Sequence, residues 1–399
     1  MTNLPQGWKW KSLGEICFIT DGTHKTPNYI ETGIPFLSVK NISKGFFDLS
    51  DVKYISLEEH NKLIKRAKPE FGDILICRIG TLGKAIKISL EFEFSIFVSL
   101  GLLKPKVKII SDYLVYFLNS CFIEEWINDN KVGGGTHTAK LNLNILEKCP
   151  IALPPLKEQE RIVGILDENF AKIDENIKIL EQDLLNLDEL MQSALQKAFN
   201  PLKDNAKENY KLPQGWEWKS LGEIANTSSG GTPSRNKKEY WENGNIKWLK
   251  SGELNDGYID FIEENITEEA IKNSSAKIFQ KGTLLIAMYG ATAGKLGILN
   301  LDSTTNQAIC AFLHKDKNIK FLEKFLFYFL FFLRDKIIKD SFGGAQPNIN
   351  QTYIKNLQIP LPPIKEQEQI ASHLDELSSH VKNLKQNYQA QIKDLQELK

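Results

Sequence analysis

The stretch PPLKEQERIVGILDE, residues 154–168, opens a run with a regular apolar pattern that continues to about Phe199. Its apolar positions follow one another in steps of four and three: Leu166, Phe170, Ile173, Ile177, Leu180, Leu184, Leu187, Met191, Ala194 and Ala198. A stripe this narrow is typical of the a/d seam of a coiled coil, whereas a helix packed on a globular core shows a wider apolar face. We therefore predict one long central helix over 154–200, and its seam needs a partner helix.

The same signal returns 208 residues later as PPIKEQEQIASHLDE, residues 362–376. A second matched pair lies at the same offset, LPQGWKWKSLGEI at 4–16 and LPQGWEWKSLGEI at 212–224. The chain is therefore a tandem duplication, each copy a globular unit followed by a long helix, and the distal helix over 362–399 supplies the partner. Four tryptophans sit in identical frames of the two copies and are expected to be core anchors: Trp8, Trp10, Trp216 and Trp218.

Both globular copies show short strand-like runs punctuated by Gly, Pro, Asn and Asp. In each copy these runs are followed by one amphipathic helix, over 112–128 and 321–338, and then by a Gly-rich loop. This order predicts an α+β domain with a mostly antiparallel sheet in each copy. We place the first domain at 1–153 and the second at 201–361, with a polar linker over 201–211.

The charges of the chain sort by region, although its 50 basic and 50 acidic side chains balance. Residues 1–150 and 201–360 each carry a net charge of +3, whereas the helical stretches 151–200 and 361–399 carry −5 and −1. The mildly basic units fit DNA weakly, and the acidic helices are expected to stay off the phosphates. Five scattered cysteines without a C-x-x-C pair indicate reduced thiols and a cytoplasmic protein. No apolar run reaches the roughly twenty residues of a membrane span, so no membrane is implied.

Several patterns that suggest chemistry are weaker than they look. GATAGKL at 290–296 and GTLGKA at 80–85 are too short for a phosphate loop, and we interpret both as hairpin turns. The E-W-K triplet at 217–219 is K-W-K in the other copy, so the carboxylate of a nuclease motif is dispensable. His24 and His137 lack Cys, Asp or Glu partners at metal-ligand spacing. We predict no catalytic, cofactor-binding or metal-binding residues.

The motifs LPxGWxWKSLGEI, DGTHxTP, SGGTPS, GDILxxRxGTxGK and PLPPxxEQxxI, in this order and duplicated, resemble the specificity (S) subunits of Type I restriction-modification systems, the HsdS family. The resemblance covers essentially the whole chain. It implies two α+β target recognition domains separated by two long helices that form an antiparallel coiled coil. Each domain would read one half of a bipartite, asymmetric sequence in double-stranded DNA through the major groove.

The resemblance also implies a non-catalytic subunit with no cofactor of its own. Two modification (methyltransferase) subunits, which bind S-adenosylmethionine and methylate adenine, dock on an S subunit. Restriction (endonuclease and translocase) subunits bring ATP and Mg²⁺. The cofactors of the complex are therefore expected on the partner subunits and not on this chain.

Matched framework segments alternate with divergent loops, which is the pattern of one scaffold that reads two targets. Side chains of Asn, Gln, Arg, Lys, Ser and Thr on rigid loops read base edges and phosphates. The DNA-binding candidates in the divergent loops are Thr23, His24, Lys25, Thr136, His137 and Lys140 in the first copy, and Thr232, Ser234, Arg235, Gln346, Asn348 and Asn350 in the second. Arg78, Lys84 and Lys295 follow or end framework strands, and we expect them to meet phosphates rather than bases.

The KEQE segment at the start of each long helix has two open interpretations. It is either a solvated first turn with acidic side chains near the positive helix end, or a surface on which other subunits dock. The docking candidates are Lys157, Glu158, Gln159, Glu160, Lys365, Glu366, Gln367 and Glu368. Two rival functions also stay open: a non-catalytic coiled-coil scaffold that joins two interaction domains without DNA specificity, and an enzyme with an unrecognised motif.

Overall fold

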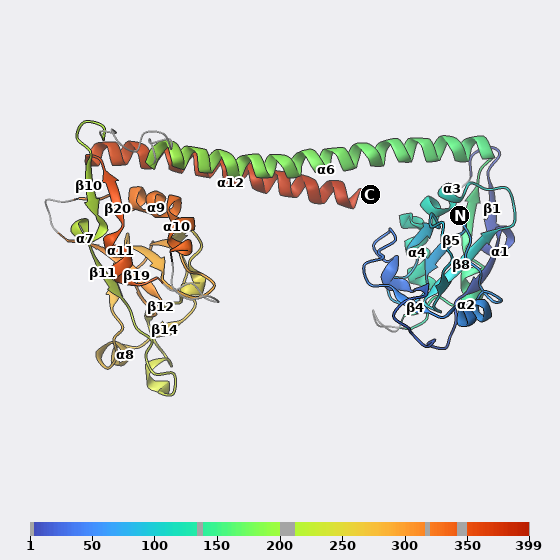
Figure 1. Ribbon diagram of the computed structural model, residues 1–399, viewed down its shortest axis with the longest axis horizontal. Coiled ribbons are helices and arrows are strands. Elements are labelled where there is room, and N and C mark those ends of the chain that lie inside the picture. Colours follow the sequence, from blue (N-terminus) through green and yellow to red (C-terminus); the bar gives the residue numbers. More distant parts are fainter. Residues whose placement is uncertain (1–3, 134–138, 200–211, 316–319, 341–348, 399) are drawn as a thin grey trace. The chain divides into compact units, whose positions relative to one another are not determined.

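The computed structural model describes residues 4–133, 139–199, 212–315, 320–340 and 349–398 (Figure 1). The chain divides into two compact units, Met1–Asp174 and Glu175–Lys399. Each unit combines β-sheets with short helices and with part of the long helix α6 (Leu156–Phe199). The predicted α+β class and the tandem repeat are confirmed, whereas the domain boundaries given above stay predictions.

Unit 1 is built on an antiparallel sheet of order β2–β8–β5–β6 (Cys17–Asp21, Leu100–Pro105, Ile74–Cys77, Ala85–Lys87). Because side chains alternate along a strand, β5 serves two cores. Ile74 and Ile76 pack with the helical layer, whereas Leu75 and Cys77 pack toward a second sheet. That second sheet has the order β4–β3–β7 (Lys53–Ile55, Ile34–Leu37, Ser95–Ile96). The helices of unit 1 are α1 (Leu13–Ile16), η1 (Val39–Asn41), α2 (Leu57–Leu63), α3 (Ser111–Leu118), α4 (Cys121–Asn130) and α5 (Leu143–Leu146).

Unit 2 repeats this plan with one added strand in each sheet, β13 (Gly257–Ile259) in the central sheet and β15 (Ile278–Phe279) in the second. Its central sheet has the order β11–β19–β16–β17–β13 (Ala225–Ser229, Ile309–His314, Leu284–Ala287, Leu296–Leu299, Gly257–Ile259), and the edge strand β13 runs parallel to β17. The second sheet has the order β14–β12–β18–β15 (Asn265–Ile266, Ile246–Leu249, Ser303–Thr305, Ile278–Phe279). Its helices are α7 (Leu221–Ile224), η2 (Lys238–Tyr240), η3 (Ser251–Glu253), α8 (Glu268–Lys272), α9 (Glu323–Phe332), α10 (Arg334–Lys339) and α11 (Gln351–Asn356).

A two-stranded ribbon joins each unit to its long helix in the same way. β1 (Lys9–Ser12) pairs antiparallel with β9 (Pro150–Leu153), and β10 (Glu217–Ser220) pairs with β20 (Gln358–Leu361) in the same register. In each unit, a tyrosine of one short helix (α3 in unit 1 and α9 in unit 2) also donates a hydrogen bond to an aspartate of the long helix. The Tyr116 hydroxyl donates to Asp167 at 2.5 Å, and the Tyr328 hydroxyl donates to Asp375 at 2.6 Å. The 208-residue offset predicted from sequence therefore holds for these aspartates and for both ribbons.

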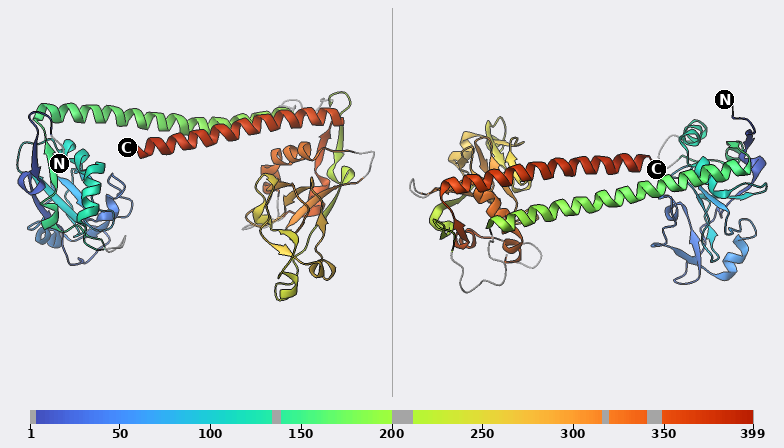
Figure 2. Two further views of the ribbon diagram at one scale, coloured as in Figure 1. Left: turned by 180° about the vertical axis from the view of Figure 1, so that it is seen from behind. Right: turned by 90° about the horizontal axis from the view of Figure 1, so that it is seen from above.

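The distal helix α12 (Ile364–Glu397) lies beside the later part of α6 within unit 2 (Figures 1 and 2). Asp188 of α6 forms an ion pair with Lys385, whereas Leu195 shares a buried cluster with Leu374 and Ala371. Residue numbers rise on one helix as they fall on the other, so the pair is antiparallel, as the resemblance implied. Among the described residues, neither this helix pair nor any other helix has the length and apolar character needed to cross a membrane.

The prediction of a single helix over 112–128 in unit 1 and over 321–338 in unit 2 is wrong, because each stretch forms two helices. In unit 1 the break at Asn119 separates α3 from α4, and the Asn119 amide bonds both the N–H and the C=O of Ala85 on β6 at 3.0 and 2.9 Å. In unit 2 the break at Leu333 separates α9 from α10, and the next residue, Arg334, donates from Nε to the Gly294 carbonyl at 3.0 Å. A polar side chain at each break thus bonds the neighbouring hairpin.

Candidate nucleic-acid interface

Three segments far apart in the sequence meet at one end of the central sheet of unit 1. β2 and β5 both run antiparallel to β8, so their carboxyl ends lie at the same edge. The loop after β2 is bridged to the chain after β7 through Thr23 and Phe97. The third segment is the chain just before α5. Its Leu141 N–H donates to the carbonyl of Arg78, in the turn after β5, at 2.9 Å.

Unit 2 brings the corresponding segments together. Gly231 N–H, in the loop after β11, donates to the Thr305 carbonyl at 2.9 Å. Ile349 N–H, at the start of the segment before α11, donates to the carbonyl of Met288 after β16 at 2.7 Å. The described parts of the loops that diverge most between the two copies therefore lie at the same end of the central sheet in each unit.

One glycine in each unit fixes the first of these loops. A Cβ on Gly22 would lie 2.0 Å from the carbonyl oxygen of Ile96, and a Cβ on Gly230 would lie 2.0 Å from that of Thr305. Both contacts are with backbone, so no side chain can move aside. The loop backbone is thus held against the neighbouring strand at matched positions, while the residues that follow differ.

The two Gly-rich turns are hairpins, as predicted, and not phosphate loops. The first joins β5 to β6 with Gly80 and Gly83 at φ of 82° and 83°, in the left-handed region that favours glycine. The second joins β16 to β17 through Gly290 and Gly294 in the same conformation. A strand follows each turn, whereas a phosphate loop opens a helix.

Lys84 and Lys295 stand at the ends of these turns. Lys295 is exposed and Lys84 is half-buried. Neither ammonium forms an ion pair with any described residue. Both therefore keep a cationic group available at the loop-bearing end of their unit.

The loop after β2 carries three of the candidates. The Thr23 hydroxyl bonds the backbone of Lys25 at 3.1 and 3.2 Å, which closes a tight turn. His24 projects from this turn with its side chain 63% exposed, and its Nε2 lies 3.1 Å from the carboxylate of Asp21. The third segment brings Lys140, whose side chain is exposed, close to the hairpin through a bridge to Ile79.

Arg78 differs from the expectation that it meets phosphate. Its side chain is only 9% exposed, and its Nη1 donates to the buried carboxylate of Asp21. Its Nε donates to the Leu141 carbonyl at 3.0 Å. Arg78 therefore ties the three loops of unit 1 together from inside, and its guanidinium is turned away from any phosphate at the surface.

Asp21 also holds Arg66, which sequence reasoning missed. The Arg66 guanidinium donates from Nη2 to the carboxylate and from Nε to the Asp21 carbonyl at 3.2 Å. Burial opposes ionisation of Asp21, but its hydrogen bond from Arg66 and the charge of Arg78 outweigh that effect, so its pKa lies below the ordinary value. The signal in the sequence was the basic run KRAK at 65–68, but nothing there linked Arg66 to a residue 45 positions earlier.

In unit 2 the candidate Arg235 is held by two tryptophans and a carboxylate. Its guanidinium carbon lies 3.6 Å from the ring centre of Trp241 and 4.8 Å from that of Trp248. Its Nη1 lies 2.6 Å from Glu264 Oε2, and the side chain stays half-exposed. The neighbouring loop residue Thr232 donates to Gln307 at 2.6 Å.

The remaining candidates of unit 2 are placed less distinctively. Ser234 is exposed, and its carbonyl accepts a hydrogen bond from Trp241 Nε1 at 3.1 Å. The Asn350 side chain accepts from Tyr353 N–H at 2.8 Å and caps α11, which is a structural use of that amide. Thr136, His137, Gln346 and Asn348 lie outside the residues that the structure describes.

The docking candidates separate into buried and exposed members. Gln159 is buried, donates to the Pro154 carbonyl at 2.8 Å and accepts from Ile110 N–H at 2.9 Å. Gln367 repeats both contacts, with the Pro362 carbonyl at 2.9 Å and Leu322 N–H at 2.8 Å. Both glutamines thus fasten a long helix to its own unit. The members left on the surface are Lys157, Glu160, Lys365 and Glu368, and Glu158 and Glu366 are half-buried.

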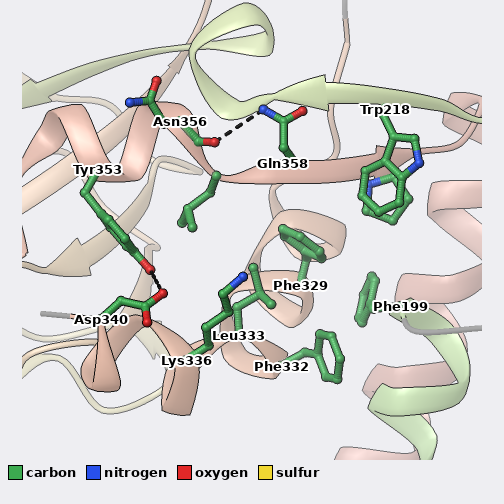
Figure 3. A pocket seen from close by; sticks show the side chains of 12 residues that line it. Phe199, Trp218, Phe329, Phe332, Leu333, Lys336, Asp340, Tyr353, Asn356 and Gln358 are labelled. Carbon is green, nitrogen blue, oxygen red and sulfur yellow. Dashed lines mark hydrogen bonds between the residues drawn. The ribbon is translucent and has the colours of Figure 1, made fainter. Parts of the chain in front are cut away.

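A pocket of 480 Å³ in unit 2 lies beside the end of α6 (Figure 3). Phe199, Phe329 and Phe332 line it as one packed aromatic group, and Tyr353 donates to Asp340 at 2.9 Å on its polar side. Burial and the Asp340 contact raise the pKa of Tyr353 to about 12. Trp218 lines this pocket with half its surface exposed, so the prediction that it is a core anchor is wrong. Of the DNA-contact candidates that the structure describes, none lines the pocket.

Cysteines and metal-ligating side chains add no further site in the described ranges. Cys17, Cys77, Cys149 and Cys310 are buried, free thiols, and Cys121 is exposed. Among the described residues, no group of three His, Cys, Asp or Glu side chains is placed to hold a metal ion.

The whole layout matches a known family. The model of the Type I restriction modification DNA specificity domain matches twice, over residues 5–183 and 213–394. The chain is 29% identical over 271 residues to the EcoR124I/EcoR124II specificity subunit of Escherichia coli, which covers 65% of this chain and 63% of that protein. It is 27% identical over 402 residues to the StySPI specificity subunit of Salmonella potsdam, which covers 94% and 83% of the two chains.

Solved structures show the same fold. A chain from a structure concerned with complex assembly and conformational transition of the type I R-M system matches 100% of this chain with a TM-score of 0.74 at 23% identity. The HsdS subunit from Thermoanaerobacter tengcongensis matches 100% of it with a TM-score of 0.65 at 22% identity. Two family-model matches that together span nearly all of the sequence decide the assignment: the chain belongs to the family of Type I restriction-modification specificity subunits.

Proposed function

We propose that each unit reads one half of a bipartite, asymmetric sequence in double-stranded DNA. The observation that carries the proposal is that the described parts of the divergent loops lie at the same end of the central sheet in both units. Matched glycines hold the first loop backbone in place, and the side chains that follow differ between the copies. A fixed backbone with variable donors and acceptors is what sequence-specific contact with base edges requires.

The proposed contacts are the candidates whose side chains are exposed or half-buried. In unit 1 they are Thr23, His24, Lys25 and Lys140 at bases and Lys84 at phosphate; in unit 2 they are Thr232, Ser234, Arg235 and Asn350 at bases and Lys295 at phosphate. Thr136, His137, Gln346 and Asn348 remain candidates from the sequence alone. Asn350 is the weakest of the described set, because its amide already caps α11.

The chain acts as a recognition subunit without catalysis or a cofactor of its own, in keeping with its family. We place S-adenosylmethionine on two modification subunits, and ATP and Mg²⁺ on restriction subunits, all bound to this chain in the cytoplasm. The exposed first turns of α6 and α12, at Lys157, Glu160, Lys365 and Glu368, are proposed docking surfaces. The rival interpretation, a scaffold without DNA specificity, is not favoured because the family is defined by DNA specificity.

Methylation of a random-sequence plasmid library tests the proposal. The full chain, co-expressed with its modification subunits and supplied with S-adenosylmethionine, is expected to direct adenine methylation to a single bipartite sequence. The chain by itself is expected to give no methylation, which is the matched control. Methylation by the complex without any sequence preference would contradict DNA reading by this chain, and methylation by the chain alone would contradict the non-catalytic role.

A further inference from the structure

The charges around Asp21 do not cancel within unit 1. Its carboxylate is 2% exposed and Arg78, which is 9% exposed, neutralises it from inside. Arg66 binds the same carboxylate but is 54% exposed. One carboxylate thus holds two guanidinium groups, so a surplus positive charge is presented at the surface beside His24.

Asp21 binds one edge of the Arg66 guanidinium, and the other edge has no partner among the described residues. Arg66 Nε lies 3.2 Å from Asp21 Oδ1 and 3.2 Å from the Asp21 carbonyl, and Nη2 donates to the same Oδ1. No described residue accepts a hydrogen bond from Nη1. A guanidinium is planar with five N–H groups in a fixed fork, so the end that carries Nη1 and the second hydrogen of Nη2 is directed away from Asp21.

We propose that Arg66 reads a guanine in the half-site of unit 1 and that Asp21 is its positioning residue. A free pair of parallel N–H groups matches the O6 and N7 acceptors that guanine presents in the major groove. The inference rests on the proposed DNA reading and adds a specificity residue that belongs to none of the divergent loops. It is a residue of the segment between α2 and β5, carried to the loops by a contact across 45 positions.

Rigidity favours a base over a phosphate as the partner of Arg66. A flexible cation suffices for a phosphate, because that contact needs charge more than direction, whereas a base edge needs a donor pair fixed in one plane. In unit 2 the stretch between α8 and β16 carries Lys277, whose Nζ donates to the Ser228 hydroxyl at 3.2 Å. The basic group that bonds the first loop region is thus a lysine ammonium in unit 2, a point charge, and a planar guanidinium in unit 1, which fits two units that read different sequences.

Protein variants give the first arm of the test, in the complex of the full chain with its modification subunits. Arg66→Ala and Arg66→Lys are both expected to lose roughly 10- to 100-fold discrimination at one base pair of one half-site, measured by methylation of the library. Arg66→Lys is the decisive variant, because it keeps the charge and removes the fork. Lys65→Ala is the matched control: it removes a neighbouring exposed cation and is expected to weaken all sequences alike.

DNA analogues give the second arm. 7-Deazaguanine removes the N7 acceptor, whereas inosine keeps both O6 and N7. At the guanine identified by the first arm, 7-deazaguanine is expected to weaken binding of the wild-type complex several-fold, and inosine is expected to leave it nearly unchanged. With Arg66→Ala in place, 7-deazaguanine should cause no further loss.

Asp21→Asn tests the positioning role through coupling. It is expected to reduce discrimination at the same base pair and, at that base pair, to add no loss to Arg66→Ala, whereas a loss elsewhere in the half-site would report the Arg78 contact. If it fails to fold, the Arg66 variants and the analogues decide the matter without it. Full discrimination by Arg66→Lys, or an equal loss on every sequence with Arg66→Ala, would overturn the inference and assign Arg66 to a phosphate. Absence of any sequence preference in the wild-type complex would instead refute the proposed function itself.

Discussion

At the scale of single residues, Asp21 links the stability of unit 1 to its candidate interface. A buried carboxylate is stable only when it is paired and hydrogen-bonded, because removal from water costs several kcal/mol. Arg78 meets this requirement from the core, and Arg66 meets it from the surface. The same ion pairs therefore hold the loops of unit 1 together and present the cation that we assign to guanine.

Asp21→Asn is expected to lower the free energy of unfolding of unit 1 by about 3–5 kcal/mol at pH 7, because it leaves the buried Arg78 without a counter-charge. The folded pKa of Asp21 lies below the ordinary value of 3.8. The stabilisation by the carboxylate is therefore present above about pH 4 and is lost as the pH falls through the folded pKa.

Denaturant unfolding of the wild type and the Asp21→Asn variant between pH 7 and pH 2.5 measures this dependence. The difference between them should shrink below about pH 4, where a protonated Asp21 and the amide side chain become alike. A difference that stays constant over this range would show that the carboxylate charge is not the stabilising feature.

The residues around Asp21 also show what a single sequence reveals about a site. The divergent loops could be found by comparing the two copies, because repetition marks the framework and leaves the variable positions visible. Burial could not be found that way: Arg78 follows a framework strand just as a phosphate contact would, and only the fold shows that it turns inward. Arg66 was missed because its partner is a contact across the unit and not a pattern along the chain.

At the scale of elements, the end of α6 acts as part of the core of unit 2. Leu195 and Phe199 are buried although they lie off the predicted seam. Phe199 packs on α9, with its ring centre 5.3 Å from that of Phe325 and 5.5 Å from that of Phe329. The helix of unit 1 that corresponds to α9 is α3. Val115 to Phe117 of α3 are only half-buried, whereas Phe327 to Phe329 of α9 are buried.

Phe199→Ala is expected to destabilise unit 2 by about 3–5 kcal/mol, because it removes a buried aromatic side chain and leaves a cavity beside the existing pocket. Hydrogen exchange followed along the full chain localises the effect. The amides of α9 should lose protection, whereas those of α3 in unit 1 should not change.

Leu185→Ala is the control for Phe199→Ala, since Leu185 lies on the same helix with 59% of its surface exposed. It is expected to change stability by no more than about 0.5 kcal/mol. Equal effects of the two substitutions would show that α6 contributes to unit 2 through helix formation alone and not through the Phe199 contact.

Some helices could be predicted accurately from the sequence, whereas the breaks in others could not. The long helices were predicted nearly to the residue, because a seven-residue repeat over many turns has no other regular interpretation. The breaks at Asn119 and Leu333 were not foreseen, because each stretch is apolar on one face throughout. What fixes the Asn119 break is a pair of hydrogen bonds to Ala85, and no local pattern encodes that contact.

At the scale of the whole molecule, duplication separates what is kept from what varies. The ribbons β1–β9 and β10–β20, the glutamines Gln159 and Gln367, and the tyrosine–aspartate bonds recur in both copies. These contacts fasten each unit to a long helix, and none of them involves a DNA-contact candidate. Loop sequences can therefore change without loosening the attachment of either unit.

Two reciprocal chimeras test this independence. Residues 20–150 are replaced by the matching region of a related specificity subunit in one chimera, and residues 228–358 in the other. Both exchanges leave β1, β10, α6 and α12 in place, so each chimera should still assemble with the modification subunits. Because the divergent loops of each unit lie wholly within one exchanged region, the first chimera should methylate a sequence with one altered half, and the second a sequence with the other half altered. Sequencing of methylated sites from a random library gives both results in one experiment. If either chimera altered both halves, the two units would not read DNA independently, and the division between framework and loops would have to be redrawn.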